Sequence, residues 1–200
     1  MSTFFHDFVL TFVPLFIVID AFGNVPFLVS MGEDMDVPRR RSMVHTAVLT
    51  ATLVGLVFLF FGQFILNVLG IPVGSFAIAG GLILLILSIQ HMMTGHMVTA
   101  ARDEMVAVVP IGTPLTVGPA TVTALLLLAL TYHLYIVLIS FAVNMLITWL
   151  VFLLGQQIAR FLGRGGLRAV SRVFSLLLAA LGVNMMIQGL NLIGIVHLGS

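Results

Sequence analysis

The fold class is decided by stretches such as residues 43–69, MVHTAVLTATLVGLVFLFFGQFILNVL, which contain no Asp, Glu, Lys or Arg. An apolar segment of this length can cross the roughly 30 Å hydrocarbon core of a bilayer as a helix. Comparable stretches cover residues 8–31, 71–93, 106–131, 134–159 and 173–196. Because backbone amides cannot stay unpaired in lipid, we predict an all-α polytopic membrane protein with six transmembrane helices.

The composition of the whole chain agrees with this assignment. The 200 residues are 60% hydrophobic, their mean hydropathy is +1.24, and they carry eight basic and seven acidic side chains. A soluble domain would present more charge to water. The formal charge of +1 does not suggest nucleic acid binding, and the absence of cysteine excludes a disulfide framework or a Cys-based metal site. We expect one transmembrane domain over residues 1–200, without a cofactor.

The basic residues are all arginine, and their positions predict the orientation. All of them fall on one side of the six expected spans: Arg39, Arg40, Arg41, Arg102, Arg160, Arg164, Arg168 and Arg172. The positive-inside rule makes that side cytoplasmic and places both termini outside. Alternatively, the four-residue spacing of the last four arginines could present a face to anionic lipid, although Gly163, Gly165 and Gly166 are expected to break a helix there.

An internal repeat relates the two halves of the chain. GQFILNVLG at residues 62–70 and GQQIARFLG at residues 155–163 are identical at five of nine positions. Further pairs occur at similar offsets, among them Pro14 with Pro110 and Phe76 with Phe174. The repeats cover residues 4–93 and 106–196, approximately. A unit of three spans is odd, so the second copy must enter the membrane inverted, an architecture of secondary transporters that bind substrate at the midplane.

The first span of each repeat contains Pro and Gly near its middle. The segments are VIDAFGNVP at residues 18–26 and PIGTPLTVGPAT at residues 110–121. Proline removes an amide donor and glycine tolerates unusual backbone angles, so each span is predicted to be two half-helices. Pro26 and Pro119 would lie in the first turns of the outgoing half-helices, after Asn24 and Gly118 as N-caps. Their N-terminal ends would attract an anionic group such as a carboxylate. The alternative is that the prolines only kink continuous helices.

Three motifs resemble those of the MarC family of six-span prokaryotic inner-membrane proteins. They are DAFGNVP at residues 20–26, IAGG at residues 78–81 and VPIGTPLTVGP at residues 109–119. The resemblance covers essentially the whole chain. It implies a transporter of small neutral amino acids, such as alanine and glycine, in the inner membrane. An exporter of another small solute or drug, or a membrane scaffold subunit that does not transport, remains the alternative.

The breaks in the two first spans define a candidate substrate site. Its residues are Asp20, Gly23, Asn24, Pro26, Thr113, Pro114, Gly118, Pro119 and Thr121. Asp20 is the only acidic residue deep in a span, where a charge is costly, and a proton or cation would relieve that cost. Asp20 is therefore either a coupling-ion or proton site, or a structural lock for the break. Asn24 and Thr121 are the preferred contacts for a small ligand, although the same atoms would suit helix capping.

For the other polar and small residues in the spans, we predict roles in helix packing or positions at the membrane interface. Hydrogen bonding between helices is expected for Gln90, Asn144, Thr148, Asn184 and Gln188, and close helix packing for Ala77, Gly80 and Gly81. His91, His96, His133 and His197 lie near span ends and are predicted to be interfacial, and no histidine has a metal-ligand partner at the fourth following position. No nucleophile elbow, second buried aspartate or zinc-binding helix motif is present, so we expect no enzyme activity. A homo-oligomer remains open.

Overall fold

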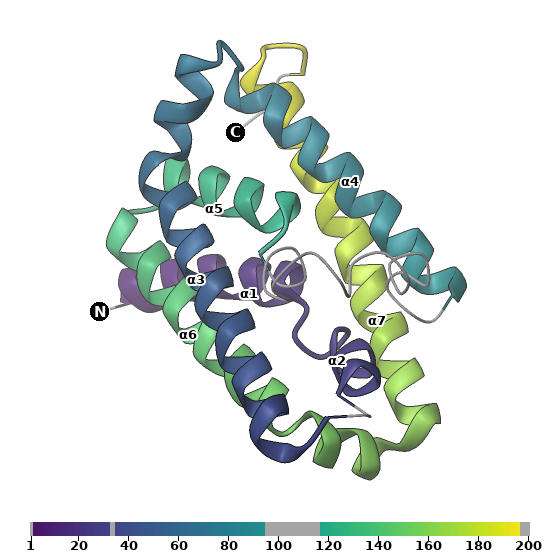
Figure 1. Ribbon diagram of the computed structural model, residues 1–200. Coiled ribbons are helices and arrows are strands. Elements are labelled where there is room, and N and C mark those ends of the chain that lie inside the picture. Colours follow the sequence, from purple (N-terminus) through teal and green to yellow (C-terminus); the bar gives the residue numbers. More distant parts are fainter. Residues whose placement is uncertain (1, 33–34, 95–116, 197–200) are drawn as a thin grey trace.

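A computed structural model describes residues 2–32, 35–94 and 117–196 (Figure 1). These residues form helices joined by short connections: α1 Ser2–Ile19, α2 Val25–Met31, α3 Val37–Val68, α4 Val73–Thr94, α5 Pro119–Thr131, α6 Leu134–Leu153 and α7 Gly155–Leu192. No strand occurs within these ranges. The all-α prediction is confirmed for this part of the chain.

Four helical segments are long and apolar enough to cross a membrane. They are Val37–Val68, Val73–Met93, Leu134–Leu153 and Gly165–Leu192, while α1 and α5 are shorter apolar helices. Large apolar side chains cover their outer surfaces, including Phe61, Phe64 and Leu176. Apolar surface on this scale is expected to contact lipid.

Two sharp turns occur between consecutive predicted spans. Gly70, just after α3, has φ 68°, and the Ile71 N–H donates to the Leu66 carbonyl at 2.9 Å. This left-handed glycine ends the helix, and Pro72 then precedes α4. Tyr132 and His133 join α5 to α6. Both turns lie at predicted span boundaries, the first between residues 43–69 and 71–93 and the second between residues 106–131 and 134–159.

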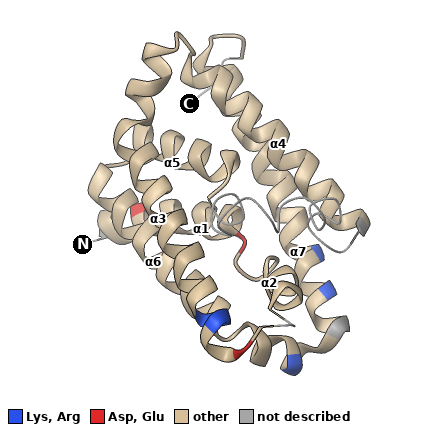
Figure 2. Cartoon of the chain, viewed as in Figure 1, with Lys and Arg blue, Asp and Glu red and all other residues tan. Residues whose placement is uncertain are grey.

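The connection between α6 and α7 differs from the prediction. Helix α6 ends at Leu153 rather than near residue 159, and α7 follows at once, with a kink at Gly163 (φ 62°, ψ 178°). Gly165 and Gly166 do not break the helix, because about 1 kcal/mol per glycine is too little to end a long helix by itself. The non-helical backbone of Gly163 confirms the predicted break at that residue, so Arg160 lies before the break and Arg168 and Arg172 lie on the helix after it. Figure 2 shows the described arginine-bearing segments toward one end of the molecule.

Helices α4 and α7 lie side by side along most of their length (Figure 1). Glycines permit this approach: Gly81 faces Gly182 and Gly74 faces Gly189. A Cβ atom added to Gly74 would lie 2.7 Å from the Gly189 carbonyl oxygen. Gly80 faces Thr123 of α5 instead. The packing predicted for the small residues of this span is confirmed.

Buried polar side chains join α1 to α6. The hydroxyl groups of Thr11 and Ser140 are 2.6 Å apart, and Asn144 Nδ2 donates to the Phe12 carbonyl oxygen at 3.3 Å. The predicted role of Asn144 between helices is thus confirmed. Thr148 donates within α6, to the carbonyl of Asn144 at 2.8 Å.

The same prediction is wrong for the polar residues of α7. Asn184 and Gln188 are exposed, because the inner face of α7 carries Leu178, Gly182 and Met185. Residues on a helix face recur every three or four positions, which turns the two amides outward. Gln90 of α4 is exposed, and its predicted hydrogen bond between helices stays a prediction.

Candidate functional site

Residues 20–24 form a non-helical link between α1 and α2 within an apolar segment. Asp20 has φ 47°, the Asn24 N–H donates to the Asp20 carbonyl at 3.1 Å, and the Val25 N–H donates to the Phe22 carbonyl at 3.2 Å. Asp20, Gly23 and Asn24 are all buried. Irregular backbone at membrane depth has to be enclosed by protein in this way.

Asp20 is completely buried in this link. Its Oδ1 accepts a hydrogen bond from the Gly23 N–H at 3.0 Å. A Cβ atom on Gly23 would overlap the carboxyl group, so this approach requires glycine. Asp20 Oδ2 has no hydrogen-bond partner among the described residues and lies 3.9 Å from His91 Nδ1.

His91 is the site residue that the sequence reasoning missed. It was expected at the membrane interface, but its side chain is only 2% exposed and faces Asp20 from α4. The interfacial prediction is therefore wrong. The physical reason is the periodicity of the helix. Ala77, Leu84 and Ser88 are buried on one face of α4, and His91 lies on the same face because residues on a helix face recur every three or four positions. That spacing is the signal that would have placed His91 on the inner face.

Asn24 occupies the predicted N-cap position of α2 but does not cap it. Its Nδ2 instead donates to the carbonyls of Ile19 at 3.3 Å and Asp20 at 2.9 Å. The side chain thus adds a donor to carbonyls at the C-terminal end of α1, where helical donors run out, and the Asp20 carbonyl accepts from both the side chain and the backbone N–H of Asn24. The predicted side-chain cap of α2 is wrong, whereas Pro26 lies in the first turn of α2 as expected.

Three phenylalanine rings join the link to α7. The centroids of Phe16 and Phe22 are 6.1 Å apart, and Phe174 lies 5.9 Å from the first and 6.0 Å from the second. Such aromatic contacts bury a large apolar area. The link therefore contacts α4 through His91 and α7 through Phe174.

The second part of the predicted site begins at α5. Gly118 is the N-cap residue and Pro119 lies in the first turn, as predicted. Thr121 is buried on α5, which contacts α1, whereas Pro119 is exposed. Thr113 and Pro114 lie outside the described residues. The structure thus brings Asp20, Gly23 and Asn24 together around one turn of backbone.

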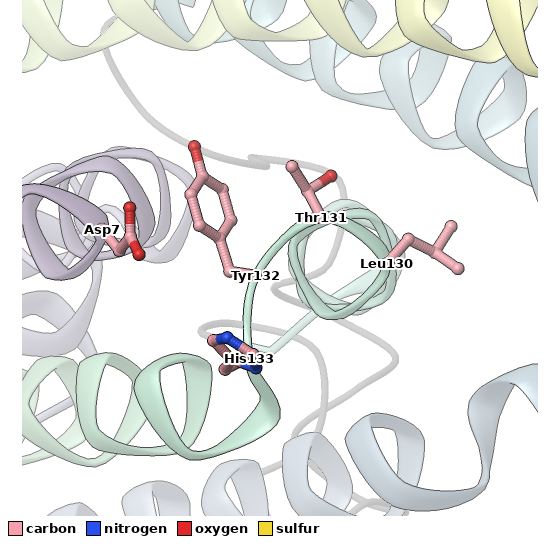
Figure 3. A pocket seen from close by; sticks show the side chains of 5 residues that line it. All are labelled: Asp7, Leu130, Thr131, Tyr132 and His133. Atoms are coloured by element: carbon pink, nitrogen blue, oxygen red, sulfur yellow. The ribbon is translucent and has the colours of Figure 1, made fainter. Parts of the chain in front are cut away.

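Two recesses of the described surface lie away from this link. One, of about 370 Å³, is lined by Asp7, Leu130, Thr131, Tyr132 and His133, where the start of α1 meets the turn between α5 and α6 (Figure 3). The other, of about 240 Å³, is lined by Val37, Arg40, Arg41, Val44, Phe152, Leu153 and Gln157. Neither is lined by a predicted site residue.

Comparison with known proteins assigns the chain at the level of a family. The family model described as MarC family integral membrane protein matches residues 5–193. A UPF0056 membrane protein of Methanocaldococcus jannaschii is 29% identical over 92% of this chain and 95% of its own length. The UPF0056 membrane protein YhcE of Escherichia coli K12 is 29% identical over 90% of this chain and 89% of its own length. The UPF0056 inner membrane protein YhgN of the same organism is 30% identical over 89% of this chain and 93% of its own length. No solved structure matches.

Proposed function

Because the chain belongs to the MarC family of integral membrane proteins, we propose that it is a secondary transporter of small neutral amino acids such as alanine and glycine. The observation that carries the proposal is the buried link of residues 20–24, which places a carboxyl and a carboxamide group inside an apolar segment. Secondary transporters form their substrate and ion sites at interruptions of this kind. The amino acid substrate itself follows from the family resemblance.

The chemistry of the link suits a small zwitterion. An amino acid needs an acceptor for its ammonium group and donors for its carboxylate group. Asp20 offers the acceptor, and Asn24 and Thr121 offer short polar side chains. The short side chains of Asn24 and Thr121 suit a small ligand, such as a substrate with hydrogen or methyl as its side chain.

The arrangement of helices supports an inverted repeat of three plus three spans. Exchanging the two repeats pairs α2 with α5, α3 with α6 and α4 with α7. Under this exchange the contact of α2 with α7 becomes the contact of α5 with α4, and both contacts are present. Gly70 and Gly163, at matching positions of the repeated motif, have φ of 68° and 62°. Alternating access would move one group of helices against the other around the link.

The proposed setting is the inner membrane, with the arginine-bearing end in the cytoplasm and both termini outside. The gathering of arginines at one end of the molecule supports this orientation (Figure 2). Transport rather than catalysis is proposed, and lipid and a small neutral amino acid are the proposed partners. The exposed amides of Asn184 and Gln188 would lie in lipid in a monomer, which favours a homo-oligomer in which they meet a second copy.

The test of transport is uptake by purified protein in liposomes. Labelled alanine or glycine should enter in a saturable manner that unlabelled substrate suppresses. Asn24→Ala should reduce uptake at least tenfold, whereas Asn67→Ala, on the exposed end of α3, should leave it unchanged. A scaffold subunit would give no saturable binding or uptake. Uptake of another solute from a panel of sugars and drugs, with none of amino acids, would favour the alternative exporter.

Asp20 is proposed as the coupling-ion site of this transporter. An uncompensated charge at this depth costs several kcal/mol, so a bound proton or cation would stabilise it. Asp20→Asn keeps the shape of the side chain and removes its charge. The variant should exchange substrate without concentrating it. If it still concentrates substrate with unchanged proton and sodium dependence, Asp20 is a structural residue.

A further inference from the structure

We propose that Asp20 and His91 together form a buried proton-binding pair, and that this pair makes the proton the coupling ion. The inference rests on the proposed transport function. It adds His91 to the coupling-ion site at Asp20 and identifies the ion as a proton. The two side chains come from the link after α1 and from α4, and 3.9 Å separates Asp20 Oδ2 from His91 Nδ1. Both are almost completely enclosed, with 0% and 2% of their surfaces exposed.

The pair is electrically neutral when it holds one proton. That proton either resides on the carboxyl group beside a neutral imidazole, or on the imidazole beside a carboxylate. Losing it would leave a net negative charge in an enclosed apolar site, which is unfavourable. Release is therefore expected only when water reaches the pair, and the proton then passes to that water. Proton binding is in this way tied to closure of the site.

The surroundings of the pair favour a proton over a metal cation. Hard cations such as sodium take several oxygen ligands, whereas Asp20 Oδ2 faces an imidazole nitrogen. Within the described ranges, no third His, Cys, Asp or Glu joins the pair in a group that would hold a metal ion. Among the described side chains of the adjoining helix α7, the basic groups are Arg160, Arg168 and Arg172, and all three are exposed. None of these three forms an ion pair with Asp20 in the described structure.

The two members of the pair belong to different groups of packed helices. Asp20 follows α1, which is joined to α6 by the contacts of Thr11 with Ser140 and of Asn144 with α1. His91 lies on α4, whose glycines hold it against α7. The contact between the two side chains therefore crosses the boundary between these groups. A displacement of α4 and α7 relative to α1 would separate the pair and open it to water.

The first experiment compares exchange with accumulation in liposomes. Wild-type protein should accumulate labelled alanine up to about tenfold under a gradient of one pH unit, if one proton moves with each substrate. His91→Gln should still exchange alanine at equal pH but lose this accumulation. His133→Gln, an exposed histidine in the turn before α6, should behave as wild type. Accumulation by His91→Gln with unchanged dependence on pH, or accumulation by wild type under a sodium gradient alone, would overturn the proposal.

A second experiment examines the pair without transport. In protein labelled with ¹⁵N-histidine, the His91 signals are identified by their loss in His91→Gln. Asp20→Asn should shift the His91 signals and leave those of His133 unchanged. If the His91 signals are the same with and without the Asp20 carboxylate, the pair does not share a proton. This result is independent of substrate, so absence of alanine exchange would count against the proposed function and not against the pair.

Discussion

Replacing Gly23 by alanine should disturb the candidate site through one identifiable contact. The backbone of Gly23 is outside the left-handed region, so alanine fits it without strain. The new methyl carbon, however, would lie 2.6 Å from Cγ of Asp20. Carbon atoms are in favourable contact at about 3.5 Å, so the carboxyl group must move by about 0.9 Å. That movement would break its hydrogen bond with the Gly23 N–H and alter its distance from His91.

The expected cost follows from the lost hydrogen bond. A hydrogen bond to a charged group contributes about 1.5–3 kcal/mol, and a neutral one about 1 kcal/mol. We therefore expect Gly23→Ala to lower the free energy of unfolding by about 2 kcal/mol. The same change in Asp20→Ala protein should cost less than about 0.5 kcal/mol, since the carboxyl group that obstructs the methyl group is gone.

The measurement is reversible unfolding in mixed micelles for the two single variants and the double variant. Gly165→Ala is the matched control, because no heavy atom lies within 4 Å of the added methyl group. It should leave stability unchanged or raise it slightly. If Gly23→Ala lowers the free energy of unfolding by the same amount in wild-type and in Asp20→Ala protein, to within about 0.5 kcal/mol, the assigned contact is refuted.

Three further measurements test the packing and the orientation. Gly74→Ala should destabilise the protein by about 1–3 kcal/mol relative to Gly165→Ala in the same unfolding assay, because its methyl group meets the backbone of α7 and no rotamer can relieve the overlap. Asn144→Leu should cost about 0.6–1.7 kcal/mol by the loss of its hydrogen bond to α1, and a stability equal to wild type would show that this bond contributes nothing. The chain has no cysteine, so single cysteines at Gly70 and Arg168 should react with an impermeant thiol reagent from opposite sides of the membrane. Labelling of both from the same side would contradict the proposed topology.

The apolar segments and turns of the described part were predictable because their causes are local. Hydropathy over about 20 residues indicates which segments can cross a bilayer. Gly70 and Pro72 end one helix and begin the next by backbone effects that involve only their neighbours. Asp20 stood out for a similar reason, since it is an acidic residue within an apolar run. Asp20 is completely buried in the folded chain, and its depth in the membrane stays a prediction.

The contacts of the site were less predictable, because equivalent polar atoms can serve several partners. Asn24 follows α1 and precedes Pro26, so capping of α2 was reasonable from the sequence. In the folded chain the carbonyls of Ile19 and Asp20 are the acceptors that its amide group reaches. Asn184 and Gln188 were expected between helices, but their direction depends on which face of α7 packs against α4.

The sequence by itself determined that the chain is an all-helical membrane protein with a carboxyl group among apolar residues. Those properties depend on composition, on periodicity and on local backbone restrictions. Only the tertiary structure decided that His91 faces that carboxyl group. The reason is that α4 reaches the link through packing between residues far apart in the chain, with glycines on α4 and α7 setting the approach of those two helices. No local pattern encodes such a distance.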